Sequence, residues 1–156
     1  MYSPKADAGI EARLRVMRVL WAMFLATVGL YALVAYLANP LSDAERARIQ
    51  GDPALAGIPT ALVVLFALGV AAVASSFVLK QAFAKKAAAL QRPGIFQQGF
   101  ILAFAFCEVA ALFGLLGLFM TGSRYAYALL AVGALGIALH FPRREQLLAA
   151  YFKPVG

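Results

Sequence analysis

Four long apolar stretches constrain the fold of this chain more than any other feature of its sequence. They cover residues 19–38, 61–79, 99–119 and 125–141. A helix needs about 20 apolar residues to cross a bilayer, whereas a strand of a membrane barrel needs about 10 residues of alternating polarity. The stretches are close to the first length and show no alternation. We therefore expect an all-α fold, an integral membrane four-helix bundle that forms one domain over residues 1–156.

The composition also favours a membrane protein. Of the 156 residues, 63% are apolar and 13% are charged, and the mean hydropathy is +0.82. Soluble domains usually carry about 25% charged residues. We therefore expect a multi-pass protein whose first partner is the lipid bilayer.

Basic residues are unevenly divided among the segments that flank the predicted spans. Eleven of the 14 Lys and Arg residues lie in the two terminal tails and the second loop: Lys5, Arg13, Arg15, Arg18, Lys80, Lys85, Lys86, Arg92, Arg143, Arg144 and Lys153. The other three, Arg46, Arg48 and Arg124, lie in the first and third loops. Because Lys and Arg near span ends stay on the cytoplasmic side, both termini and the second loop are predicted to be cytoplasmic. The net charge of +7 then suits anionic headgroups, and no nucleic-acid partner is expected.

The remaining loop and flanking residues fit ordinary roles in a membrane protein. Ser42 and Glu45 form a capping-box pattern, which predicts a short outer amphipathic helix over about residues 43–50. The loop MTGSRY is so short that the last two spans should be antiparallel neighbours. Aromatic residues near the span ends are interpreted as interfacial anchors: Trp21, Tyr31, Tyr36, Tyr125 and Tyr127.

The sequence carries no familiar catalytic motif. It has no phosphate-binding glycine loop, no HExxH and no paired cysteines. Cys107 is the only cysteine and is expected to pack as a small apolar residue, while His140, the only histidine, is interpreted as an interfacial polar residue. One Cys, one His and one carboxylate within the spans do not form a set of nucleophile, base and orienting group. We therefore expect no enzyme activity, no cofactor and no metal site.

Small residues recur at helical spacing in the last three spans. Such residues let helix backbones approach closely in lipid. They either hold the helices of one chain together or face neighbouring copies, and one sequence leaves both interpretations open. The predicted packing residues are Gly69, Ala72 and Ser76 in the second span, Ala110, Gly114 and Gly117 in the third, and Gly133 and Gly136 in the fourth.

Glu108 is the only charged residue between positions 103 and 119. It lies roughly 13 Å from the cytoplasmic end of its predicted span, close to the bilayer midplane. A charge at that depth costs several kcal/mol or more unless it is paired, hydrated or neutralised, so ionisable groups inside the membrane are functional candidates. We therefore take Glu108 as the candidate ion-binding residue.

Two arrangements of the second and third spans give Glu108 different neighbours. In a symmetric hairpin that turns near Pro93, the residues close to Glu108 would be Ser75, Ser76 and Lys80. A Lys80–Glu108 ion pair would then argue against ion exchange. If the second helix instead ends near Lys80, Ala71 and Ala72 are level with Glu108 and Lys80 extends to the membrane surface.

The segment QRPGIFQQGFILAFAFCEVAALFGLLGLF, residues 91–119, resembles the second half of subunit c, the proteolipid of rotary ATP synthases. The shared features are a basic loop with glutamine and proline, a central carboxylate, small residues and an aromatic-Gly-Leu step. The resemblance implies a cytoplasmic loop and Glu108 as the residue that binds a proton or Na⁺. With FMTGSRYAYALL and HFPRREQL, the whole layout resembles uncharacterised bacterial four-span membrane proteins. That likeness implies a protein of the bacterial cytoplasmic (inner) membrane.

Two functions follow from these features. The chain is expected to be a structural or accessory subunit of a larger membrane complex, with Glu108 as a hydrogen-bonded or paired group. The alternative is a proteolipid-like subunit whose Glu108 binds and releases a proton or Na⁺. In both cases the expected partners are other membrane subunits or further copies of this chain.

Overall fold

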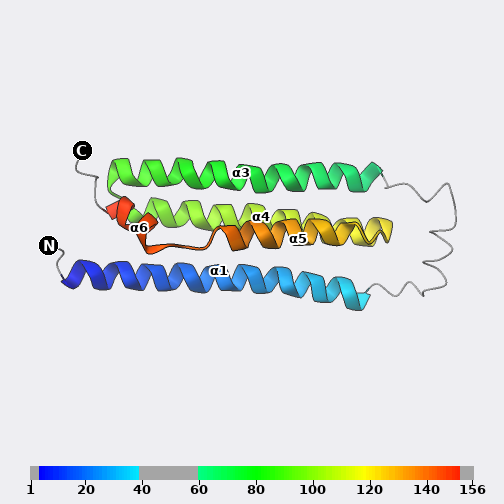
Figure 1. The fold of residues 1–156 in the computed structure, drawn as a ribbon, viewed down its shortest axis with the longest axis horizontal. Coiled ribbons are helices and arrows are strands. Elements are labelled where there is room, and N and C mark those ends of the chain that lie inside the picture. The colour runs from blue at the N-terminus through cyan, green and yellow to red at the C-terminus, as the bar shows by residue number, and fades with distance from the viewer. Residues whose placement is uncertain (1–3, 39–59, 152–156) are drawn as a thin grey trace.

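The computed structural model describes residues 4–38 and 60–151, and its regular structure in these ranges is entirely helical. Its helices are α1 (Pro4–Ala38), α3 (Thr60–Leu90), α4 (Pro93–Thr121), α5 (Ala126–Leu139) and α6 (Arg144–Tyr151). Figure 1 shows α1, α3 and α4 as long, roughly aligned rods. The predicted all-α class is confirmed for this part of the chain. The outer helix predicted near residues 43–50 lies outside the described residues.

Three helices are long and apolar enough to cross a membrane, over Gly9–Ala38, Thr60–Leu90 and Pro93–Thr121. Each is longer than the span predicted from hydropathy. The second predicted span ends at residue 79, but α3 continues to Leu90 because the segment KQAFAKKAAAL consists mainly of strong helix formers. The apolar stretch ends at Lys80 because that residue is charged, whereas the helix continues for ten more residues.

A tight turn joins α3 to α4. Gln91 has a positive φ of 48°, and Arg92 is extended with φ −117° and ψ 92°. Proline disfavours helical conformation in the residue before it and is well tolerated at the first position of a helix. Pro93 therefore ends one helix and begins the next, which gives the symmetric hairpin that was one of the two predicted arrangements.

The fourth predicted span, 125–141, differs most from the structure. Helix α5 has only 14 residues and is about 21 Å long, too short to cross a hydrocarbon core of about 30 Å as a helix. Pro142 accounts for the early end, because it disfavours a helical residue at position 141 and cannot donate a backbone hydrogen bond. The chain continues as a non-helical segment, residues 140–143, to α6.

Helix α4 is the centre of the bundle. It packs against α3, α5, α1 and α6, whereas no Cα atom of α1 lies within 8 Å of one in α3. Figure 1 shows α4 and α5 between these two outer helices. The chain therefore forms a compact group of α3, α4 and α5, with α1 packed along α4 and α5.

Glycines allow α4 and α5 to touch backbone to backbone. A Cβ atom on Gly133 would lie 2.7 Å from the carbonyl oxygen of Cys107 and 2.9 Å from the Cβ of Ala111. A Cβ on Gly114 would lie 2.8 Å from the backbone nitrogen of Leu130. Such close contact is the usual basis of helix association in lipid.

The other predicted packing glycines also face neighbouring helices of the same chain. The residues nearest to them are Leu129 for Gly69, Leu62 for Gly117, and Cys107 for Gly136. Ala72 is partly buried on α3. The small residues therefore lie at contacts within this bundle.

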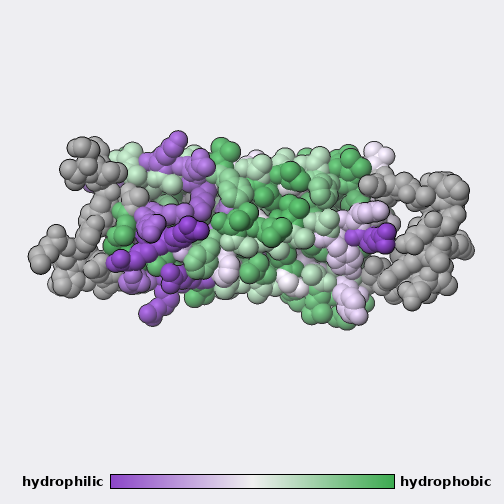
Figure 2. Space-filling view, in the orientation of Figure 1, coloured by the Kyte–Doolittle hydropathy of each residue, from purple (hydrophilic) through white to green (hydrophobic). Residues whose placement is uncertain are grey.

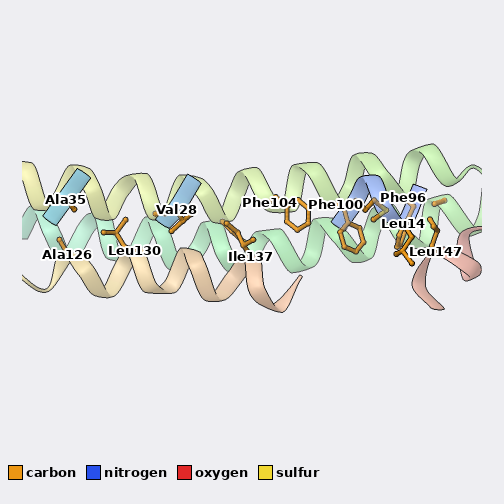
Figure 3. Close-up of a cluster of buried hydrophobic side chains, with 14 of the residues drawn as sticks. Leu14, Val28, Ala35, Phe96, Phe100, Phe104, Ala126, Leu130, Ile137 and Leu147 are labelled. Carbon is orange, nitrogen blue, oxygen red and sulfur yellow. The ribbon is translucent and has the colours of Figure 1, made fainter. Parts of the chain in front are cut away.

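Aromatic side chains fill the bundle beyond the end of α5. Phe96, Phe100 and Phe104 follow one another along α4, with ring centroids 4.9 and 5.8 Å apart. Leu14 of α1 and Leu147 of α6 lie beside them in the buried cluster (Figure 3). Large side chains thus occupy the space that α5 would fill if it were longer, while small residues line α4 where α5 is present.

We expect Gly133→Ala to lower the free energy of unfolding by about 1–3 kcal/mol, because the new methyl group meets backbone atoms that cannot move aside alone. Gly29 on α1 is the matched control, since a Cβ there has no atom within 4 Å. Gly29→Ala should be neutral or stabilise by up to about 1 kcal/mol. Reversible unfolding in mixed micelles measures both, and equal effects would contradict the close α4–α5 contact.

Candidate functional site

Glu108 accepts a hydrogen bond from the hydroxyl of Tyr31. The Tyr31 Oη to Glu108 Oε1 distance is 2.8 Å, and the bond joins α1 to α4 near the middle of α4. Both side chains are partly buried. Tyr31 is thus a partner of the carboxylate, although its sequence position indicated an interfacial anchor. The two residues are 77 positions apart, and no local pattern connects them.

Lys80 does not pair with Glu108 in the described part of the chain. Its Nζ atom lies 4.4 Å from the centroid of the Phe100 ring, nearer the end of the bundle that holds α6. Cation–π contacts of this kind stabilise a partly desolvated ammonium group. The long side chain therefore extends away from the level of Glu108.

Of the other two predicted neighbours of Glu108, Ser76 lies at nearly the same depth but on another side of α4. Ser76 contacts Cys107, the residue directly before Glu108, so the register is that of the symmetric hairpin. Successive residues of a helix are rotated by about 100°, so Cys107 faces α3 and α5 while Glu108 faces α1. Ser75, also partly buried, precedes Ser76 on α3 and takes no part in this contact.

A second polar cluster lies inside the bundle and joins α3, α4 and the end of α5. Its members are Ser76, Cys107 and His140, all of them buried. The Ser76 Oγ lies 3.1 Å from His140 Nε2 and 3.4 Å from Cys107 Sγ. The interpretation of His140 as an interfacial residue is wrong, because α5 ends so early that His140 lies at the depth of Cys107.

The hydroxyl of Ser76 uses its full hydrogen-bonding capacity in this cluster. It donates its only proton to the carbonyl oxygen of Val73 at 2.6 Å. Its two lone pairs then accept the thiol proton of Cys107 and a proton from His140 Nε2. In this arrangement the Nε2 atom of His140 is the donor to Ser76. Its buried Nδ1 has no hydrogen-bond partner among the described residues.

This proton arrangement leaves no base directed at the Ser76 hydroxyl. A serine or cysteine nucleophile needs a neighbouring base that can accept its proton. Here the Ser76 proton goes to a backbone carbonyl, and the Nε2 atom of His140 is a donor. The described residues also contain no group of three or more His, Cys, Asp and Glu side chains placed to hold a metal ion.

Trp21 completes the polar contacts at the end of α5. Its indole Nε1 donates to the carbonyl oxygen of Ile137 at 2.9 Å. The Ile137 carbonyl also accepts a hydrogen bond from the His140 backbone N–H at 3.0 Å, so Trp21 occupies its second lone pair and links α1 to the end of α5. The ring of Phe141 packs edge-on against Trp21, with centroids 5.1 Å apart.

Ser76→Ala should lower the free energy of unfolding by about 1–2 kcal/mol, because it leaves the buried donors of Cys107 and His140 without an acceptor. The control is Ser75→Ala, which removes the adjacent hydroxyl and should change stability by less than about 0.5 kcal/mol. Unfolding in mixed micelles provides the comparison. If the two variants behave alike, Ser76 is not the centre of the cluster.

Comparisons with protein-family models, with curated proteins and with solved structures find no match to this chain. The functional argument therefore depends on the chemistry of the two polar sites. Of these, the cluster at Ser76 is enclosed, and the Tyr31–Glu108 pair reaches the surface.

Proposed function

We propose that this chain is a multi-pass membrane protein that serves as a structural or accessory subunit of a larger membrane complex. The observation that carries the proposal is the position of Glu108. Its carboxylate is partly exposed among apolar residues near the middle of α4, and Tyr31 is its one hydrogen-bond donor among the described residues. Lipid chains cannot donate to its remaining acceptor sites. A donor from a neighbouring subunit would stabilise the carboxylate in place.

The distribution of charge supports a membrane position for the bundle. Figure 2 shows hydrophilic residues gathered at the end near α6 and a hydrophobic middle. Ser76 contacts Cys107, so Lys80, one turn further along α3, is level with Ala103 in the antiparallel α4. The distance from Ala103 to Arg124 along the helix axis is about 30 Å, which matches a hydrocarbon core.

The apolar surface between these two levels is large. It includes exposed side chains from three helices: Leu30 and Leu33 of α1, Val63, Val64 and Leu68 of α3, and Leu112 and Leu116 of α4. This placement sets Glu108 about 8 Å inside the boundary at Lys80, nearer the surface than the roughly 13 Å expected from hydropathy.

In this placement α5 and the segment 140–143 together make the fourth crossing. A helix of 14 residues, about 21 Å long, and the non-helical segment after it are together about as long as the hydrocarbon core is thick. Irregular backbone is tolerated at that depth only where protein covers it. The side chains of His140 and Pro142 are buried, whereas those of Phe141 and Arg143 are exposed, so protein covers one side of this segment.

A second function, proton binding at Glu108, is favoured by the position of Lys80. An ion pair with Lys80 would hold Glu108 as a permanent carboxylate, but the ammonium group lies over Phe100. A proton needs a single acceptor oxygen, whereas a hard cation needs several oxygen ligands. Glu108 and Tyr31 together suit a proton better than Na⁺. This function agrees with the resemblance of residues 91–119 to the ATP synthase proteolipid.

We propose that the chain lies in the bacterial inner membrane with both termini and the α3–α4 turn on the cytoplasmic side. Cysteines introduced one at a time can test this orientation. Gln98→Cys at the exposed start of α4 should be inaccessible to an impermeant maleimide in intact cells, and Ser123→Cys in the α4–α5 loop should react. Permeabilised cells should label both. If only Gln98→Cys is labelled in intact cells, the proposed orientation is wrong and the opposite one holds.

Glu108→Gln separates the two functions, because it keeps size and hydrogen bonding but cannot titrate. If the chain is an accessory subunit, the variant should still co-purify with the same partners from crosslinked native membranes. A wild-type chain that migrates alone as a monomer in mild detergent, without crosslinked partners, would contradict this role.

Proton binding predicts that a hydrophobic carbodiimide modifies Glu108 faster at about pH 6 than at about pH 8. Glu108→Gln should abolish the labelling, and Glu145→Gln, which removes an exposed carboxylate on α6, is the matched control. Lys80→Ala should leave the rate unchanged. Slow labelling that does not depend on pH would count against the proton-binding function.

A further inference from the structure

Three cations lie on or beside the segment 140–143, which follows α5 and contains Arg143. Lys80 of α3 is partly buried and lies one turn from Ser76, whose hydroxyl contacts His140 at the start of this segment. Arg18 of α1 lies with its guanidinium carbon 5.7 Å from the centroid of the Phe141 ring. These three side chains come from α3, from α1 and from the segment between α5 and α6.

No carboxylate of the described side chains is ion-paired with any of these cations. Glu11 pairs with Arg144, with the Arg144 Nε to Glu11 Oε1 distance at 3.0 Å. Glu108 is bonded to Tyr31. Lys80 is partly desolvated by burial and is repelled by Arg143, and no acidic side chain among the described residues offsets that repulsion. Lys80 is partly buried while Arg143 and Arg18 are exposed, so an anion at the surface can reach all three positive charges.

An apolar surface leads up to these cations along α5. Leu135 and Leu139 are 62% and 69% exposed and lie one turn apart on the same side of the helix. Phe141, 40% exposed, follows them directly before Pro142 and Arg143. The surface therefore changes from apolar to cationic within a few residues.

We propose that this place is a binding site for an anionic phospholipid, with its phosphate between Lys80 and Arg143 and an acyl chain along Leu135 and Leu139. Arginine matches the paired oxygens of a phosphate with its planar group, and lysine adds a compact charge. Arg18 adds positive potential from the far side of Phe141. The inference rests on the membrane placement proposed above, which sets Lys80 at the hydrocarbon boundary where lipid phosphates lie.

The experiment uses the full chain in nanodiscs or mild detergent. Binding of phosphatidylglycerol is compared with that of phosphatidylcholine, and native mass spectrometry counts the retained lipids. The test variants are Lys80→Gln and Arg143→Gln. The matched control is Lys86→Gln, an exposed residue of α3 at the same end of the bundle. Lys80→Arg tests whether charge alone is needed.

Lys80→Gln and Arg143→Gln should each weaken phosphatidylglycerol binding about fivefold, because the bound phosphate loses one of its direct partners. Lys86→Gln should weaken it much less. Lys80→Arg should keep most of the affinity. Equal losses for all three Gln variants would mean diffuse surface attraction and would overturn the site.

Inorganic phosphate and glycerol phosphate distinguish lipid from a soluble anion. If either displaces phosphatidylglycerol at comparable concentration, the site takes a free phosphate group and the lipid assignment fails. Recovery of the chain in the soluble fraction of cells would instead refute the membrane placement. The two failures are therefore separable, because the first leaves the protein in the membrane.

Discussion

The early end of α5 at His140 determines much of the rest of this structure. A helix that stops inside a bundle leaves carbonyl groups and an irregular backbone where water is scarce, and each unpaired group there is costly. Ser76 binds the His140 ring from α3, and Trp21 binds the Ile137 carbonyl from α1. The three phenylalanines of α4 fill the volume beyond. These features lie far apart in the sequence, yet each compensates for the same short helix.

Cys107 and Glu108 show how one position along a helix separates structure from function. Cys107 faces the interior, where Ser76 accepts its thiol proton and the polar groups are almost fully matched. Glu108 faces α1, where Tyr31 supplies one bond and acceptor capacity is left over. The enclosed side stabilises the bundle. The acceptor capacity left on the open side is what supports the proposed binding of a proton or of a donor from another subunit.

Hydropathy and small-residue spacing predict the apolar helices and the positions of Gly114 and Gly133, because both signals are local and both reflect packing in lipid. They do not predict where helices end. Lys80 ends an apolar stretch, but α3 continues to Leu90. Pro142 ends α5 before the fourth apolar stretch is over. The Tyr31–Glu108 bond depends on how α1 rotates against α4, over a separation of 77 residues. Arrangements of that kind follow from the summed packing of whole helices, and no single motif carries them.

The separation of Trp21 from Ile137 also has a consequence for the order in which the protein is made. The two residues are 116 positions apart, and chains are synthesised at roughly 5–20 residues per second. Residue 137, which carries the acceptor, is therefore synthesised roughly 6–23 s after Trp21. Until Thr121 is reached, α1 has neither a complete α4 nor α5 beside it, so its stability must come from its own side chains. The exposed Val19, Met23 and Leu30 are well suited to that period, since lipid can cover them before any other helix arrives.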